Sequence, residues 1–138
     1  MTLVLDNSVT MRWCFGDGSP EDLDYAAAVS RQLQTDTALV PAIWALEVVN
    51  VVTRAESLGQ LEADTSGAFL AVLRDMRIVA DPDTGRYAFN ATMDLARRHQ
   101  LSAYDAAYLE LAQRKQIPLA TLDTDLRKAA STAGVSLF

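Results

Sequence analysis

The chain has 138 residues and a formal net charge of −6; half of its residues are hydrophobic and only 7% are aromatic. This length is enough for one domain with a substantial core, so we expect residues 1–138 to form a single folded unit. Phosphates repel an acidic surface, which taken alone disfavours a nucleic-acid binder, but acids that converge on divalent cations would reverse that repulsion where a substrate arrives.

Short apolar segments alternate with helical patterns along the chain. In chain order we expect a strand at 3–6, a helix from residue 7, a turn at 16–20, a helix at 21–34, a strand at 38–41, helices at 42–58 and 62–74, a strand at 77–81, helices at 87–99 and 102–115, a strand at 117–123, a helix at 124–134 and a last strand at 135–138. This alternation predicts an α/β fold with a short parallel sheet of about four to five strands and helices on both faces. Such sheets bind ligands beyond the carboxyl ends of the strands, where the strand order reverses.

The sequence is typical of a cytoplasmic protein. Cys14 is the only cysteine and cannot form an intrachain disulfide, which fits a reducing compartment. No apolar run approaches the roughly 20 residues that cross a bilayer, and MTLVLDNS lacks the basic segment of a signal peptide. One cysteine and one histidine, His99, cannot build a zinc site of the usual nitrogen and sulfur ligands.

Four acidic residues from distant parts of the chain are candidates for one site. Asp6 ends the first expected strand, and Asp123 ends the fourth. Asp105 lies near the start of the helix before the fourth strand, and Glu47 lies early in the helix after the second. Because the carboxyl ends of parallel strands share one edge, all four acids are candidates for that edge.

Glu47 is the most informative of these acids. Its helix, AIWALEVVNVVTRAE, is apolar nearly all round up to Thr53, so we expect it to be largely buried. Asn50, three residues further on, is the only other polar group on that face. A cation or a bound water near the strand ends could bind the side chains of both Glu47 and Asn50. The alternative is a buried ion pair between Glu47 and Arg54.

Helix capping could explain the other acids one at a time. Asp105 shares a stripe of its helix with Tyr108 and further apolar residues, where an unsatisfied carboxylate costs several kcal/mol. Ser102-x-x-Asp105 also fits a capping box, and Asp6 and Asp123 can each cap the helix that follows them. That explanation needs three separate helix caps and leaves Glu47 without a role, whereas a single shared site accounts for all four acids.

Absent motifs narrow the reaction class. The chain has no G-x-G-x-x-G loop, no Gly-rich G-K-[ST] loop and no G-x-S-x-G motif. The first strand ends in DNSV, without the second Asp of a D-x-D phosphatase loop. A receiver domain needs an acceptor Asp at a middle strand and a late Lys, and the strands at 77–81 and 117–123 match that pairing poorly. Carboxylates without nitrogen or sulfur partners select Mg²⁺ or Mn²⁺, and such a cluster suits phosphodiester hydrolysis.

Four segments carry a family resemblance: LVLDNSVTMRWCF, PAIWALEVVNVV, LSAYDAAYLELAQRKQIPLATLD and DLRKAASTAGV. They span essentially the whole chain and resemble a PIN domain, and more narrowly a VapC-type toxin of a bacterial toxin–antitoxin pair. The resemblance implies a PIN-like three-layer sandwich and a Mg²⁺-dependent endoribonuclease, with Mn²⁺ as a substitute, that cuts translation RNA, often tRNA. It also implies a homodimer and a hetero-oligomer with a cognate VapB-type antitoxin, whose C-terminal segment covers the site.

The resemblance also implies site residues. The family's four acids fall on Asp6, Glu47, Asp105 and Asp123. We expect Asp6 and Asp105 to be the primary metal ligands, and Glu47 to bind metal through water or to direct the nucleophile. Asp123 would complete the cluster or support a second ion. Supporting positions fall on Ser8, Asn50, Thr121 and Asp125, of which Asp125 could exchange roles with Asp123.

Basic residues must hold the RNA. Arg12 lies nearest to the first acid, and the other candidates for phosphate contact are Arg97, Arg98, Arg114, Lys115, Arg127 and Lys128. Each of them is more often a solvated surface charge. Trp13 and Trp44 could stack on bases, although packing is the commoner role. We expect dimer and antitoxin contacts within the segment 20–75.

Two other functions remain open at this point. The first is a catalytically silent binding module of the same fold, although such a module has no reason to keep mutually repelling carboxylates. The second is a metal-dependent phosphatase that acts on small molecules. The missing D-x-D and the lack of a cap insertion disfavour that reading.

Overall fold

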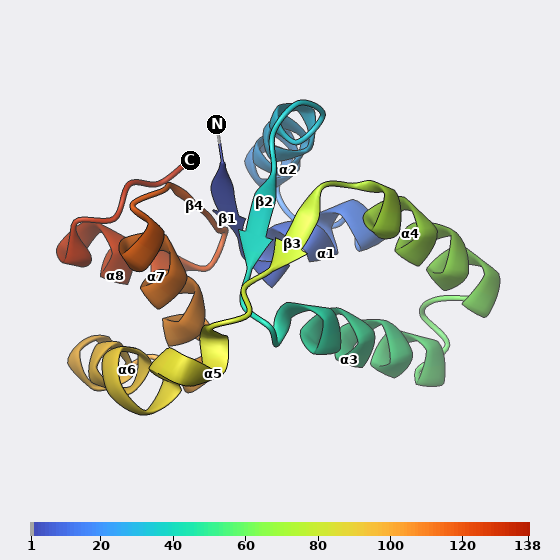
Figure 1. Ribbon diagram of the computed structural model, residues 1–138. Helices are drawn as coiled ribbons and strands as arrows, with labels where there is room; N and C mark the ends of the chain where they lie inside the picture. The colour runs from blue at the N-terminus through green and yellow to red at the C-terminus, as the bar shows by residue number, and fades with distance from the viewer. Residues whose placement is uncertain (1) are drawn as a thin grey trace.

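The computed structural model describes residues 2–138, in which short strands are joined by helices (Figure 1). The strands are β1 (Leu3–Leu5), β2 (Ala38–Val40), β3 (Ile78–Ala80) and β4 (Leu119–Ala120). The helices are α1 (Asn7–Phe15), α2 (Pro20–Gln32), α3 (Trp44–Ser57), α4 (Ala63–Asp75), α5 (Thr84–Tyr87), the π-helical η1 (Ala88–Thr92), α6 (Met93–His99), α7 (Ala103–Lys115) and α8 (Thr124–Ala133). No helix in this described part of the chain is long and apolar enough to cross a membrane.

The four strands form one parallel sheet in the order β3-β2-β1-β4. Val4 of β1 pairs with Leu39 on one side and with Leu119 on the other, so β1 is a central strand. Leu3, Val4 and Leu5 have no exposed surface, as expected for a parallel strand that is covered on both faces. The chain steps from β1 to β2 to β3 and then returns across the sheet to β4, so the strand order reverses beside β1.

Helices cover both faces of the sheet. In Figure 1, α3 and α4 lie on one side of the strands, and α5 to α8 lie on the other. Helix α7 contacts both β1 and β4, and all of its residues from Ala106 to Ala112 are buried. The predicted α/β fold, with a parallel sheet between two layers of helices, is therefore confirmed.

The end of the chain differs from the sequence-based expectation. The segment 135–138 forms only an isolated bridge, between Leu119 and Leu137, instead of a last strand. Strand β4 is also shorter than the expected 117–123. Pro118 has no N–H to donate to a neighbouring strand, and after Ala120 the side chain of Thr121 accepts from the backbone N–H of Asp123 and turns the chain toward α8.

The expectation that α3 is largely buried was wrong. Trp44, Val48 and Val52 form one buried stripe with a spacing of four residues. Leu46 is 72% exposed and Val49 is 45% exposed, so a second apolar stripe of the same helix faces solvent. The sequence shows that the helix is apolar, but not which of its apolar residues meet the sheet.

Both tryptophans are part of the packing. Trp44 is buried, and its indole N–H donates to the Thr10 hydroxyl at 3.2 Å. Trp13 is half-buried, and its indole N–H donates to the backbone carbonyl of Ala26 at 2.8 Å, which joins α1 to α2. Packing is therefore the role that the structure shows for both rings.

An ion network joins the end of β3 to α7. Asp81 and Glu110 are both buried, and the Arg114 guanidinium donates to both carboxylates. Asp81 also accepts from the Thr84 hydroxyl, and the Arg114 guanidinium lies 4.4 Å from the ring centroid of Tyr87. Arg114 is engaged by these contacts, which makes it a weaker candidate for phosphate contact than a free basic side chain.

Arg114→Gln should destabilise the fold strongly, because it leaves two buried carboxylates without their cation. Breaking a buried pair by removing one partner costs about 3–5 kcal/mol. Lys115→Gln, at the exposed neighbouring position, should change the free energy of unfolding by less than about 0.5 kcal/mol. Urea unfolding followed by circular dichroism measures both values; equal stability of the two variants would show that the network is not structural.

Candidate active site

Asp6 lies at the point where the strand order reverses. It directly follows β1, and its backbone N–H donates to the carbonyl of Ala120 in β4 at 3.0 Å. Its side chain is only 4% exposed and does not cap α1, so the capping alternative for this residue was wrong. Instead, Oδ2 of Asp6 accepts hydrogen bonds from the hydroxyls of Ser8 at 2.6 Å and Thr121 at 2.7 Å.

The two hydroxyls beside Asp6 also fix the loop after β4. The Ser8 hydroxyl accepts from the backbone N–H of Leu122 at 3.0 Å, and the Thr121 hydroxyl accepts from the N–H of Asp123 at 3.1 Å. The start of α1 and the exit of β4 are thereby tied together around one carboxylate. Ser8 and Thr121, which the sequence suggested as supporting residues, do lie against Asp6.

Glu47 lies in the first turn of α3, and its partner is a tyrosine. The Tyr108 hydroxyl of α7 donates to Oε1 of Glu47 at 2.6 Å. No ion pair joins Glu47 to Arg54 within residues 2–138, so that alternative was wrong. Asn50 is exposed, whereas Glu47 is half-buried, so the expected polar pair on an inner face is absent from the described structure.

Asp105 is held by a capped helix start and is coupled to the other acids. The Ser102 side chain caps α7 by accepting from the backbone N–H of Asp105 at 3.1 Å, as the capping reading predicted. Partial burial raises the pKa of the Asp105 carboxyl, and the charges of Asp6, Asp123 and Asp125 raise it further. The cap and the acidic surroundings therefore coexist.

Charge effects link Asp6, Glu47 and Asp105, and the charge of Asp123 acts on two of them. Burial raises the pKa of Asp6, the two hydroxyls partly offset this rise, and the charge of Asp123 adds to it. Burial also raises the pKa of Glu47; the Tyr108 hydroxyl opposes this rise, and the charges of Asp6 and Asp105 increase it. Among residues 2–138, none of these carboxylates forms an ion pair with lysine or arginine.

The side chains are near one another but do not form a closed metal site. Over residues 2–138, no three acidic, histidine or cysteine side chains are grouped closely enough to hold an ion. Asp123 uses Oδ1 to cap α8, where it accepts from the N–H of Leu126 at 2.8 Å, and Asp125 is exposed. Arg12 pairs with Asp17 at 3.2 Å, so the structure does not bring it to the acids.

Tyr108 is the residue at this site that the sequence argument did not assign. Its ring has no exposed surface, and its hydroxyl meets Glu47 across two helices. A signal for it exists, because a tyrosine three residues after Asp105 lies on the same helix face and needs a partner for its hydroxyl when buried. The sequence alone does not indicate that the partner is Glu47.

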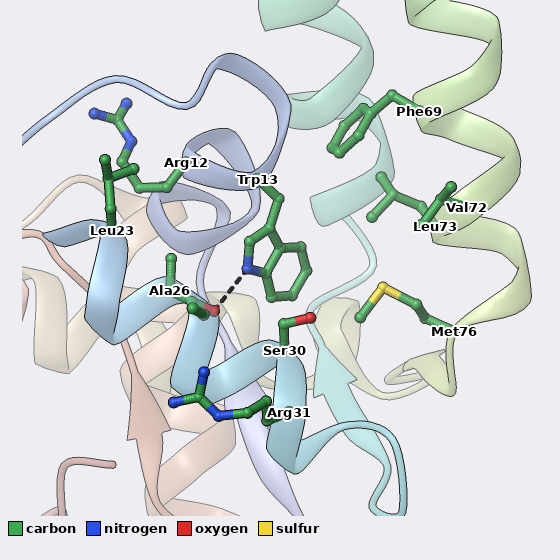
Figure 2. A pocket seen from close by; sticks show the side chains of 11 residues that line it. Arg12, Trp13, Leu23, Ala26, Ser30, Arg31, Phe69, Val72, Leu73 and Met76 are labelled. Atoms are coloured by element: carbon green, nitrogen blue, oxygen red, sulfur yellow. Dashed lines mark hydrogen bonds between the residues drawn. The ribbon is translucent and has the colours of Figure 1, made fainter.

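A separate apolar groove of about 560 Å³ lies between α1, α2 and α4. Figure 2 shows Trp13 at its centre, Phe69 and Val72 of α4 on one side together with Met76, which directly follows α4, and Arg31 of α2 on the other. Arg12 also lines this groove. The groove combines apolar walls with positive charge, and its lining comes from residues 12–76.

Asp105→Asn should raise the melting temperature at neutral pH when divalent ions are chelated. The folded-state pKa of Asp105 is raised, so the ionised acid lowers stability as the pH rises through that value. Solvent screening keeps the gain small, at about 2–4 °C. The gain should shrink near pH 4, about the ordinary carboxyl pKa, where the acid is largely protonated when folded. Scanning calorimetry at both pH values measures it; an unchanged or lower neutral-pH melting temperature would contradict the proposed repulsion.

Comparisons with known proteins agree with this architecture. Solved structures that resemble the chain include VapBC2 from Rickettsia felis bound to a DNA fragment from their promoter (TM-score 0.68, 12% identity, covering 100% of this chain and 98% of that one). FitAcB from Neisseria gonorrhoeae has a TM-score of 0.63 and 19% identity, with 100% and 96% of the two chains covered. A Pyrobaculum aerophilum protein has a TM-score of 0.63 and 19% identity, with 94% and 87% covered. These identities show likeness of fold alone, and a search of curated proteins found no match.

Residues 3–131 match the model of the PIN domain, and the chain therefore belongs to the PIN domain family.

Proposed function

We propose that this PIN domain is a VapC-type toxin, a Mg²⁺-dependent endoribonuclease that cuts tRNA or another translation RNA and is neutralised by a VapB-type antitoxin. The observation that carries the proposal is a group of acids from separate elements, in which the charges of Asp6, Asp105 and Asp123 raise the pKa of neighbouring carboxyls and no acid has a basic partner in the described chain. Fold likeness to VapBC2 and FitAcB adds support. The two alternative functions, a silent module and a phosphatase, give different outcomes in the test below.

The donor set fits a hard divalent cation. Asp6, Glu47, Asp105 and Asp123 supply only carboxylate oxygens, which suit Mg²⁺ or Mn²⁺. Binding would relieve the repulsion among them, which is a reason for such acids to be kept together. Because the side chains do not yet surround one point, we expect small side-chain rotations when an ion binds.

Each acid has a distinct position from which to act. A divalent cation, when bound, would polarise a phosphate oxygen and a nearby water. Asp6, whose Oδ2 is fixed by two hydroxyls, and Asp105 would be the primary ligands. Glu47 would direct or deprotonate the water through Oε2, because Oε1 already accepts from Tyr108. Asp123 would complete the cluster or support a second ion, with Asp125 beside it.

Positive charge for the RNA backbone is available next to the acids. Lys128 and Arg98, which also pairs with Asp94 at 3.2 Å, line a polar groove between α6 and α8 that includes Asp125. The charge of Asp125 raises the pKa of Asp105, so we place this groove beside the acidic site. We propose that phosphates of the substrate follow this groove, in preference to Arg12 or Arg114.

Glu47→Gln should abolish most RNA cleavage while the fold persists. Loss of a group that directs the water lowers the rate by about 10²–10⁴-fold. Cleavage of a fluorogenic RNA, with Mg²⁺ and with a chelator, measures the effect. Glu56→Gln, on the same helix, is the matched control and should cleave normally.

The same assay separates the proposed function from its alternatives. Undiminished cleavage by Glu47→Gln would remove this residue from the mechanism. Hydrolysis of a small phosphate ester without cleavage of RNA would favour the phosphatase. If the wild type acts on neither substrate with Mg²⁺, the chain is a silent binding module. Sequencing of RNA ends formed on induction in cells would identify the substrate.

We further propose that the groove between α1, α2 and α4 receives the antitoxin. Trp13 and Phe69 offer apolar contacts, and Arg31 adds positive charge, which together suit an amphipathic segment with acidic residues. The exposed apolar stripe of α3, with Leu46 and Val49, supports a homodimer through this helix. Both surfaces lie within or close to the segment 20–75 named from the sequence.

Val72→Asp should weaken antitoxin binding without loss of RNA cleavage. Val72 is 57% exposed on the groove wall, so the substitution introduces a charge where an apolar contact is expected and hardly disturbs the core. We expect at least about a tenfold loss of affinity, the equivalent of 1.4 kcal/mol. Val79→Asp, at a site 50% exposed and outside the groove, is the control. Titration of the co-expressed antitoxin measures binding; equal affinity of the two variants would place the antitoxin elsewhere.

A further inference from the structure

The Tyr108 hydroxyl lies where three parts of the acidic site meet. Tyr108 follows Asp105 by three residues in α7, so both side chains leave the helix on the same face. Its hydroxyl donates to Oε1 of Glu47 in α3 at 2.6 Å. The backbone N–H of Asn7, which directly follows Asp6, also faces this hydroxyl. One buried group therefore connects the segments that carry Asp6, Glu47 and Asp105.

Glu47 depends on this hydrogen bond for its position. The charges of Asp6 and Asp105 repel its carboxylate. In the described chain, Tyr108 is the only hydrogen-bond donor to the Glu47 side chain, and no cation pairs with it. Glu47 is itself only half-buried, so the carboxylate has a route to water. Without the Tyr108 hydroxyl, repulsion and solvation would both move Glu47 outward.

We propose that Tyr108 is a positioning residue, which holds Glu47 beside Asp6 and Asp105 and leaves Oε2 of Glu47 available for a cation or a water. This inference rests on the proposed function, because it assigns Tyr108 to the same acidic site. The structural alternative is that Glu47 serves only to satisfy a buried hydroxyl. The two readings differ in what the loss of the hydroxyl does to metal binding.

The first experiment measures Mn²⁺ binding in the absence of RNA, by electron paramagnetic resonance of the full chain. Tyr108→Phe keeps the buried ring and removes the hydroxyl. The fold should persist, because the half-buried Glu47 can turn to solvent, and thermal melting verifies this. Loss of a group that orients a ligand weakens metal affinity by about 10–100-fold, and we expect about tenfold here. Tyr104→Phe, exposed on the same helix, is the control and should bind Mn²⁺ like the wild type.

A double variant tests whether Tyr108 acts through Glu47. In the Glu47→Gln background, Tyr108→Phe should change Mn²⁺ affinity by less than about twofold, because the group that it positions is already altered. A general structural role predicts the same loss in both backgrounds. That result, or a Tyr108→Phe variant with wild-type affinity, would overturn the inference.

RNA cleavage distinguishes failure of the inference from failure of the proposed function. Tyr108→Phe should lower kcat for RNA cleavage by about 10–100-fold, with KM for the RNA unchanged. If the wild type binds Mn²⁺ but cuts no RNA, the nuclease proposal fails, and the Mn²⁺ comparison still decides the role of Tyr108. If Tyr108→Phe equals the wild type in both assays, only the positioning role fails. A wild type without Mn²⁺ binding would overturn both.

Discussion

The burial of Asp6 at the end of the central strand is the constraint on which the site depends. A carboxylate that is 4% exposed needs hydrogen bonds or an opposite charge to offset its lost hydration. Ser8 and Thr121 supply hydrogen bonds from the two chain segments that flank the sheet reversal. They offset the cost only in part, because the pKa of Asp6 remains raised. The fold therefore holds an acid under conditions that favour either a proton or a cation.

Capping and function do not compete at this site. Ser102 caps α7, and Asp123 caps α8 through Oδ1. Each cap fixes the start of a helix at the sheet edge, and the helix start carries an acid of the site. The capping reading of the sequence was thus right for Ser102 and Asp123, although it was wrong for Asp6. It does not weaken the reading of a shared site, since the cap of α8 uses only one carboxylate oxygen of Asp123 and the cap of α7 uses the backbone N–H of Asp105, so carboxylate oxygens remain for other contacts.

The sequence predicts the fold well because strand position, helix spacing and acid placement are local patterns. Asp6 could be placed at a strand end from the alternation of strands and helices alone, whereas Ser8 and Thr121 were named only because the family resemblance implied them. The contacts of Glu47 could not, because they depend on how α3 and α7 cross. The sequence suggested Asn50 or Arg54 from the same helix, whereas the partner is Tyr108, 61 positions away. The solvent exposure of Leu46 and Asn50 was missed for the same reason, since an apolar run does not show how much of a helix the sheet covers.

The sheet edge also contains an internal comparison that bears on the cation. Asp81 follows β3 as Asp6 follows β1, and both side chains are buried. Burial acts to raise the pKa of Asp81, but the hydrogen bonds and charge of Arg114 outweigh it and hold that pKa below its ordinary value. No arginine or lysine pairs with Asp6 in residues 2–138. The same helix, α7, thus brings a guanidinium to one edge acid and a further carboxylate, Asp105, to the other. Asp81 is neutralised by the chain's own cation, whereas Asp6 has carboxylates and no cation near it, and the divalent cation that we propose would account for this contrast.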